Sequence, residues 1–138
     1  MNTSAHDIQI TARVIPESER LDMLPKHFGR YLMVVENMIY GWTRRLVPNY
    51  TGAYWQFYEL SNNGFYMAPS IDKSHVSVEG NGFEGEMSAD AIGITACLFA
   101  YSHGSFQFRS ETFGNHYHWL REYSYFHPAA QLISAACD

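Results

Sequence analysis

The chain has 138 residues, of which 46% are hydrophobic, 16% aromatic and 17% charged, so it is long and apolar enough to form one globular domain and is not a disordered adaptor. A formal net charge of −5 argues against a nucleic-acid-binding protein, which needs a basic surface, and we expect no specific nucleic-acid binding. The same charge is too small for an extended DNA mimic, whose carboxylates would have to match the density of DNA phosphates.

Nothing in the sequence indicates secretion or a membrane span. The N-terminal residues contain no apolar run of the kind that forms a signal peptide. The longest uncharged stretch, residues 91–108, is interrupted by polar side chains and would make a poor membrane span. Cys97 and Cys137 match neither a disulfide-rich scaffold nor a zinc ribbon. We therefore expect a cytoplasmic protein that makes no contact with membranes.

The N-terminal part predicts a tail and a short helix. Residues 1–15 are expected to form a tail that is either paired or loose, and residues 16–138 the folded domain. Pro16 is followed by acidic residues, which favour the positive end of a helix dipole. This helix is expected to end near Leu24, because Pro25 follows.

The next segment has the clearest helical period of the chain. Its apolar residues recur at spacings of three and four and predict one long helix with a single apolar stripe. Arg44 and Arg45 fall in its last turn, where cations favour the negative end of the dipole, and Pro48 bars continuation. The stripe consists of Phe28, Tyr31, Leu32, Val35, Met38, Ile39, Trp42 and Leu46.

An aromatic segment with a period of two follows and predicts a β-hairpin. Residues 53–58 alternate between two faces, and the sequence Asn62-Asn63-Gly64 indicates the turn. Most such aromatic side chains lie in a core. The alternative is an exposed strip that contacts a partner protein, and its tyrosines would be Tyr54, Tyr58 and Tyr66.

A second hairpin is predicted over residues 75–87, around a two-residue turn at Asn81-Gly82. One face would be apolar and the other acidic. In this register Glu79 lies directly opposite Glu84, and such like-charge pairs cost about 0.2–1 kcal/mol. The acidic face is either simply solvated or a contact surface for a basic partner, and its carboxylates would be Glu79, Glu84 and Glu86.

The C-terminal part predicts helices. Ser88 fits the N-cap of a helix that is apolar on all sides and should therefore lie at the centre of the fold. Residues 110–125 predict another helix, which His127-Pro128 ends, and residues 129–136 a last short one. The order of elements predicts an α+β domain, with helices packed on one face of a small antiparallel sheet built from hairpins.

No motif indicates a catalytic, cofactor or metal site. The sequence G-x-G-x-x-G at residues 80–85 lies at a hairpin tip, whereas dinucleotide binding needs a helix directly after the glycines. His116 and His118 would point to different faces of a helix. Cys97 lies in the most apolar helix, where a thiol is inert. We assign no catalytic, cofactor-binding or metal-ligating residue, although triads depend on geometry rather than on sequence spacing.

Several distinctive segments are spread from about residue 15 to the C-terminus. They are Leu24-Pro25, His27-Phe28-Gly29-Arg30, Tyr40-Gly41-Trp42, a long aromatic block from Tyr54 to Pro69, Ala91-x-Gly93-Ile94-x-Ala96 and His116-Tyr117-His118-x-Leu120-Arg121. Together they resemble the plasmid antirestriction proteins of the ArdB/KlcA type. The aromatic block is long enough to be a specific signal.

This resemblance implies a protein of plasmids or other mobile elements that protects incoming DNA from the host's type I restriction–modification enzymes. It implies no catalytic residue and no extended DNA mimicry, so we expect an inhibitor that is not an enzyme. Its expected partner is the host type I restriction–modification complex, contacted directly or indirectly. Two alternatives from other classes stay open: a small hydrolase with a cryptic active site, and a DNA-binding accessory protein of plasmid maintenance.

Overall fold

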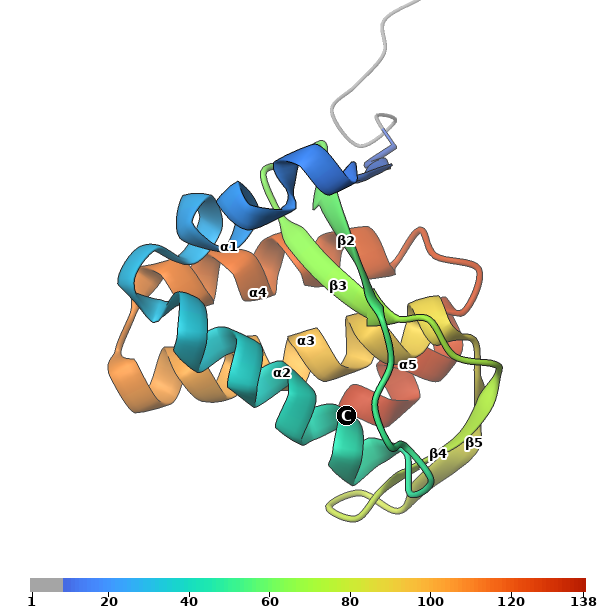
Figure 1. Cartoon of the computed structure of the whole chain (residues 1–138). Helices are drawn as coiled ribbons and strands as arrows, with labels where there is room; N and C mark the ends of the chain where they lie inside the picture. The colour runs from blue at the N-terminus through green and yellow to red at the C-terminus, as the bar shows by residue number, and fades with distance from the viewer. Residues whose placement is uncertain (1–8) are drawn as a thin grey trace, which may run out of the picture.

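A computed structural model describes residues 9–138 (Figure 1). Helices pack against a three-stranded antiparallel sheet of order β1-β2-β3 and a separate hairpin, β4–β5. The α+β class predicted from the sequence is confirmed. In chain order the elements are β1 (Ala12–Val14), η2 (Glu17–Glu19), α1 (Arg20–Phe28), η3 (Gly29–Tyr31), α2 (Leu32–Leu46), β2 (Trp55–Leu60), β3 (Phe65–Pro69), β4 (Ser74–Val78), β5 (Phe83–Met87), α3 (Ala89–Phe108), α4 (Glu111–Ser124) and α5 (Ala130–Cys137).

Helix α3 lies at the centre of the fold, as its apolar sequence predicts. The Ser88 side chain caps its N-terminus by accepting a hydrogen bond from the backbone N–H of Ala91 at 3.2 Å. Residues 91–98 are all buried, because α2, α4, α5 and β3 pack around the helix (Figure 1). A helix that is covered on all sides needs apolar residues on all sides.

Helix α3 also covers the free edge of β3. The Tyr101 hydroxyl donates a hydrogen bond to the backbone carbonyl of Phe65 at 2.6 Å, and the Cys97 thiol lies 3.7 Å from the carbonyl oxygen of Met67. These contacts occupy carbonyl groups that an uncovered edge strand would expose. Gly93 allows the close approach, since a Cβ there would lie 2.5 Å from the Cα of Ala68.

The first hairpin has the predicted strands and turn. Trp55 pairs with Pro69 at the open end, and Glu59 pairs with Phe65 next to the turn. The turn residue Asn63 has a φ of 82°, a left-handed conformation that asparagine tolerates better than most residues. The structure therefore confirms the hairpin.

The alternative of an exposed strip of Tyr54, Tyr58 and Tyr66 is wrong. Tyr66 is 1% exposed, because β3 is buried along its whole length. Its hydroxyl donates a hydrogen bond to Asp90 at 2.7 Å, and its ring stacks on that of the half-buried Tyr58 at 4.6 Å. Only Tyr54, at 54% exposed, lies largely in solvent. A period of two identifies the two faces of a strand, but the packing of helices decides whether both become buried.

The second hairpin forms, but its predicted register is wrong. Ser77 pairs with Glu84 and Val78 with Phe83, so Glu79 lies in a four-residue turn and not opposite Glu84. The Asn81 side chain explains this wider turn, because its Nδ2 donates to the carbonyl of Ala136 at the end of α5, at 3.0 Å. The difference of two residues leaves the side chains within the two strands on their predicted faces.

Pro25 does not end the first helix, contrary to the prediction. Helix α1 continues to Phe28 with Pro25 inside it, and Gly29, with a φ of 53°, follows its end. The lost backbone hydrogen bond is offset by burial on one side of the helix, where Met23, Leu24 and Phe28 are between 2% and 6% exposed. The long helix predicted after it forms as α2, with Arg44 and Arg45 in its last turn. It begins only at Leu32, so Phe28 and Tyr31 of the predicted stripe lie before it, in α1 and η3.

The last residues of the expected N-terminal tail form part of the fold. Residues 1–8 of it lie outside the described residues. Ala12–Val14 pair with β2 as strand β1, and Ile15 is 1% exposed. In the range 9–138, no helix combines the length and apolarity that crossing a membrane requires.

Replacement of Gly93 by alanine tests the contact between α3 and β3. We expect Gly93→Ala to lower the free energy of unfolding by about 1–3 kcal/mol, because the new Cβ would overlap backbone atoms of β3 that cannot rotate away. The matched control is Gly41→Ala in α2, where nothing lies within 4 Å of the new Cβ; it should be neutral or stabilise by about 0.5–1 kcal/mol. Urea denaturation measures both, and equal effects of the two variants would contradict the packing argument.

Candidate functional site

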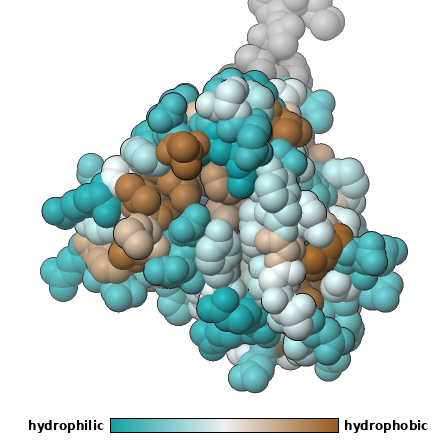
Figure 2. Space-filling view, viewed as in Figure 1, coloured by the Kyte–Doolittle hydropathy of each residue, from teal (hydrophilic) through white to brown (hydrophobic). Residues whose placement is uncertain are grey.

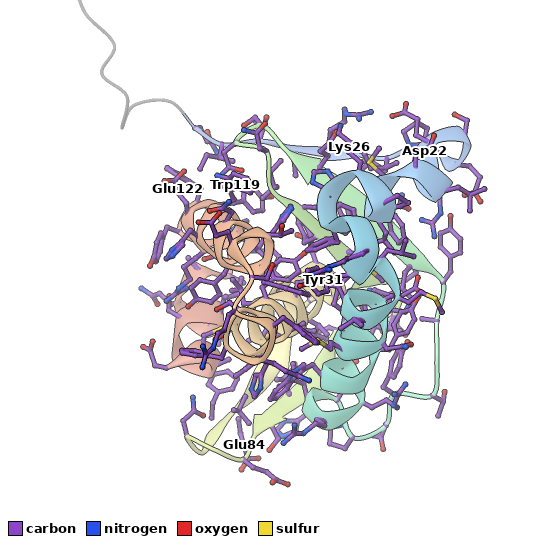
Figure 3. All side chains as sticks on the ribbon, turned by 90° about the vertical axis from the view of Figure 1, so that its left-hand side faces the viewer. Asp22, Lys26, Tyr31, Glu84, Trp119 and Glu122 are labelled. Atoms are coloured by element: carbon purple, nitrogen blue, oxygen red, sulfur yellow. The ribbon has the colours of Figure 1, made fainter. Side chains whose placement is uncertain are left out.

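A cleft of about 440 Å³ lies between α1, the β2–β3 turn and α4, a size within the range of small-molecule sites. Lys26 of α1 and Trp119 of α4 lie on the same side of the molecule, on different walls of this cleft (Figure 3). The lining residues are Lys26, His27, Glu59, Leu60, Asn63, Thr112, Asn115, His116 and Trp119.

Glu59 is the charged centre of the cleft and joins three elements. Its Oε2 accepts hydrogen bonds from Lys26 at 2.7 Å and from the His27 ring at 2.7 Å, and its Oε1 accepts one from Arg13 at 3.0 Å. Burial acts to raise the pKa of Glu59, but the hydrogen bonds from Lys26, Arg13 and His27 outweigh it and lower the pKa to about 2. The carboxylate therefore stays ionised and links β1, α1 and β2.

Two neutral histidines lie beside this carboxylate. Burial lowers the pKa of His27 and outweighs the opposite effect of Glu59, so at neutral pH its Nε2–H donates to the carboxylate. His116 is 2% exposed, with its ring centre 4.4 Å from that of Phe28 and 5.1 Å from that of His27. Burial lowers the pKa of His116 to about 3. Its Nδ1 has no hydrogen-bond partner among the described residues.

The wall opposite Lys26 is held by the turn of the first hairpin. The side-chain amide of Asn62 donates to the backbone carbonyl of Trp119 at 2.9 Å and accepts from the N–H of Gly64 at 3.1 Å. A Cβ at Gly64 would lie 2.8 Å from Leu60 and 3.0 Å from Trp119, so only glycine allows this close contact between the turn and α4. The shape of the cleft is therefore set by tight packing and not by a loose loop.

The expected acidic face lies at the other end of the molecule. Glu84 lies far from Lys26 and Trp119 (Figure 3). Glu79, Glu84 and Glu86 are all exposed, and Glu84 contacts the His75 ring at 3.1 Å. The tyrosines of the other possible contact surface lie on the first hairpin, as expected, where Tyr54 donates to Glu17 and Tyr66 donates to Asp90, each at 2.7 Å. The acidic face and the tyrosines therefore belong to two separate regions of the molecule.

The other sequence motifs do not form a recognisable catalytic or metal site. Residues 80–85 form the tip of the second hairpin and part of β5. Burial raises the pKa of Cys97 to about 12, which keeps its sulfur a thiol. In the described part of the chain, no three His, Cys, Asp or Glu residues are placed to share a metal ion.

Known proteins resemble this chain over its full length. The family model described as antirestriction protein matches residues 48–138. Two Escherichia coli proteins named antirestriction protein KlcA are 44% and 39% identical to it; the first match covers 100% of both chains, the second 96% of this chain and 99% of the relative. The chain belongs to the antirestriction protein family.

A solved structure supports the same relationship. It is described as showing that the KlcA and ArdB proteins have a novel fold, with antirestriction activity against type I DNA restriction systems in vivo but not in vitro. It matches this antirestriction protein with a TM-score of 0.90 and 43% sequence identity, over 100% of both chains. The fold and the sequence therefore lead to the same family.

The cluster of His27, Glu59 and His116 has no signature in the sequence. Its members come from α1, β2 and α4, so no local spacing marks them as a group. The available signal is Glu59 itself, a carboxylate inside a strand of mostly aromatic and apolar residues. A charged residue in such a strand needs partners when it is buried.

The two buried histidines predict how stability depends on pH. Both have a pKa below the ordinary value of 6.5, so the unfolded chain binds protons before the folded chain does. The contribution of these two histidines to the free energy of unfolding should be complete above pH 6.5 and should decrease as the pH falls toward about 3. Glu59 adds a further loss as the pH falls from its ordinary value of 4.5 toward about 2.

Urea denaturation at a series of pH values measures this dependence. We expect His116→Gln to reduce the loss of stability between pH 6.5 and pH 4.5, because it removes one buried group that must stay neutral. The control His75→Gln changes a histidine whose side chain is 54% exposed and should retain the parent's slope. If the free energy of unfolding of His116→Gln changes with pH as it does in the parent protein, His116 is not the source of the pH dependence.

Proposed function

We propose that this antirestriction protein protects unmodified incoming DNA by inhibiting host type I restriction–modification endonucleases in the cytoplasm, as a binding protein and not as an enzyme. The observation that carries the proposal is the match to KlcA and ArdB, which covers both chains completely at 43% identity. Those proteins are described as active against type I systems in vivo but not in vitro. An inhibitor that acts through another component of the cell agrees with both properties, whereas one that needs only the restriction complex would also be active in vitro.

The charge distribution supports a protein partner over DNA. Arg13 and Lys26 both contact the carboxylate of Glu59, and Arg20 lies 3.7 Å from that of Glu17. These contacts use basic side chains that a DNA-binding surface would present to phosphates. The 14 acidic residues are also too few to reproduce the charge of a DNA duplex.

One observation favours the alternative of a small hydrolase. The pair of His27 and Glu59 resembles an imidazole that a carboxylate holds in position for general-base catalysis. Nucleophilic catalysis also needs a hydroxyl or thiol within hydrogen-bond reach of the base. Within residues 9–138, no serine, threonine, tyrosine or cysteine side chain donates to either imidazole of the cleft. Inhibition by binding is therefore the better-supported function.

Expression of the protein in cells with an active type I system should raise the plating efficiency of unmodified phage and leave methylation of host DNA at its normal level. The basis is the membership of the antirestriction family. Phage that already carries the host modification is plated in parallel and should show no change. Plating of unmodified phage at the vector-control level across several type I classes would reject the proposed function.

We propose the acidic side of the second hairpin as a contact for a basic surface of the restriction machinery. Glu79, Glu84 and Glu86 remain exposed there, although the register differs from the predicted one. The combined variant Glu79→Gln/Glu84→Gln/Glu86→Gln should stay folded and lose part of the phage protection. A partial loss is expected because exposed charges at an interface mainly change the association rate.

A matched variant separates a local contact from a general effect of charge. Asp22→Asn/Asp72→Asn/Glu111→Gln also removes three exposed negative charges, but from other parts of the surface. It should retain full protection. Circular dichroism checks the fold of both variants, and full protection by the folded hairpin variant would eliminate the acidic contact.

A further inference from the structure

The charged side chains around the Glu59 cleft are paired with one another, so none is free to bind an ionic ligand. Arg13 and Lys26 bring two positive charges, and both contact Glu59. Arg13 also lies 3.3 Å from Glu19, so two carboxylates balance the two cations. Burial keeps the His27 and His116 rings neutral at neutral pH. Neither an anion nor a cation finds an unpaired opposite charge in this cluster, and an uncharged ligand is favoured.

Uncharged polar groups of the β2–β3 turn and of α4 meet at the same cleft. Asn63 of the β2–β3 turn and Thr112 and Asn115 of α4 line it, and both asparagines are exposed to solvent. His116 lines it too, with its Nδ1 unpartnered although the residue is 2% exposed. A buried polar atom without a partner costs free energy, and such atoms are rare in native structures. This convergence is typical of a ligand site.

The chemistry of these groups selects the class of ligand. Each of the two asparagine amides presents a donor and an acceptor in one plane, a pattern that pairs with the edge of a nucleobase. Trp119 supplies an aromatic ring of the kind on which bases stack. The cleft volume of about 440 Å³ is sufficient for a small molecule. We propose that the cleft between α1 and α4 binds the nucleobase of an uncharged nucleoside through Asn63, Asn115 and Trp119.

This site is separate from the acidic hairpin, which lies at the other end of the molecule (Figure 3). Ligand binding can therefore be measured without reference to antirestriction activity, and it does not depend on the proposed function. The expected arrangement is an edge-on contact of the base with the amides, with its face against the indole ring. The His116 ring lies at the base of the cleft, 5.1 Å from Trp119 in an edge-to-face contact.

Titration of the ¹⁵N-labelled full chain with adenosine, guanosine, cytidine and thymidine tests the proposal by NMR. At least one nucleoside should cause saturable shifts in the side-chain amides of Asn63 and Asn115 and in the indole N–H of Trp119. Asn115→Ala changes an exposed helix residue, so it should stay folded and weaken binding about fivefold, the effect of one hydrogen bond. The matched control is Asn49→Ala in a second cleft of about 390 Å³, which should leave the affinity unchanged.

Further probes identify the source of the base and its competitors. A short single-stranded oligodeoxynucleotide should bind more weakly than the nucleosides, because the cleft has no unpaired positive charge for its phosphates. Tighter binding of the strand than of every nucleoside would overturn the proposal of an uncharged nucleoside. Absence of saturable shifts with every nucleoside would overturn the proposal. Binding of glucose or N-acetylglucosamine in place of nucleosides would also overturn it, as would tighter binding of adenosine monophosphate than of adenosine, because the charge argument would then fail.

Discussion

Helix α3 packs along the free edge of β3, and the other helices take their positions from it. The contact requires Gly93, which brings the helix axis close to the strand backbone, and it is completed by the hydrogen bond from Tyr101 to the carbonyl of Phe65. With both partners buried, α2 and α4 pack against the remaining sides of α3. Gly104 allows a similar close approach between α3 and α4, since a Cβ there would lie 2.6 Å from the Phe113 ring. Small residues thus determine how closely the layers approach.

The position of α4 creates the cleft, and Glu59 connects the elements around it. A partly buried carboxylate is costly unless donors surround it; here Arg13, Lys26 and His27 supply them. Removal of one donor would leave charge uncompensated, so the cluster favours one arrangement of β1, α1 and β2. Because these charges are paired with one another, the cleft is a polar surface without an unpaired charge. The exposed carboxylates of the second hairpin form a different, acidic surface at the other end of the molecule.

Figure 2 shows a third kind of surface, with hydrophobic residues gathered over α1 and the beginning of α2, where Leu21 and Met33 are exposed.

Local rules account for most of the secondary structure. The Ser88 cap and the turn at residues 62–64 follow from chemistry between neighbours in the sequence. The errors occur where a distant segment intervenes. Helix α1 passes through Pro25 because its apolar side is buried in the core, and the second hairpin has a wider turn because Asn81 donates to α5. Tyr66 is buried because helices cover β3 completely.

The sequence by itself determined the α+β class, the order and the approximate bounds of the main elements, the two hairpins and the antirestriction family, because each depends on periodicity, capping, turn chemistry or a run of matching residues. The tertiary structure alone decided which faces are buried, the register of the second hairpin and the cleft around Glu59. His27, Glu59 and His116 meet only after α1, β2 and α4 have packed. Their neutral and ionised states then follow from burial and hydrogen bonding, which no spacing along the chain specifies.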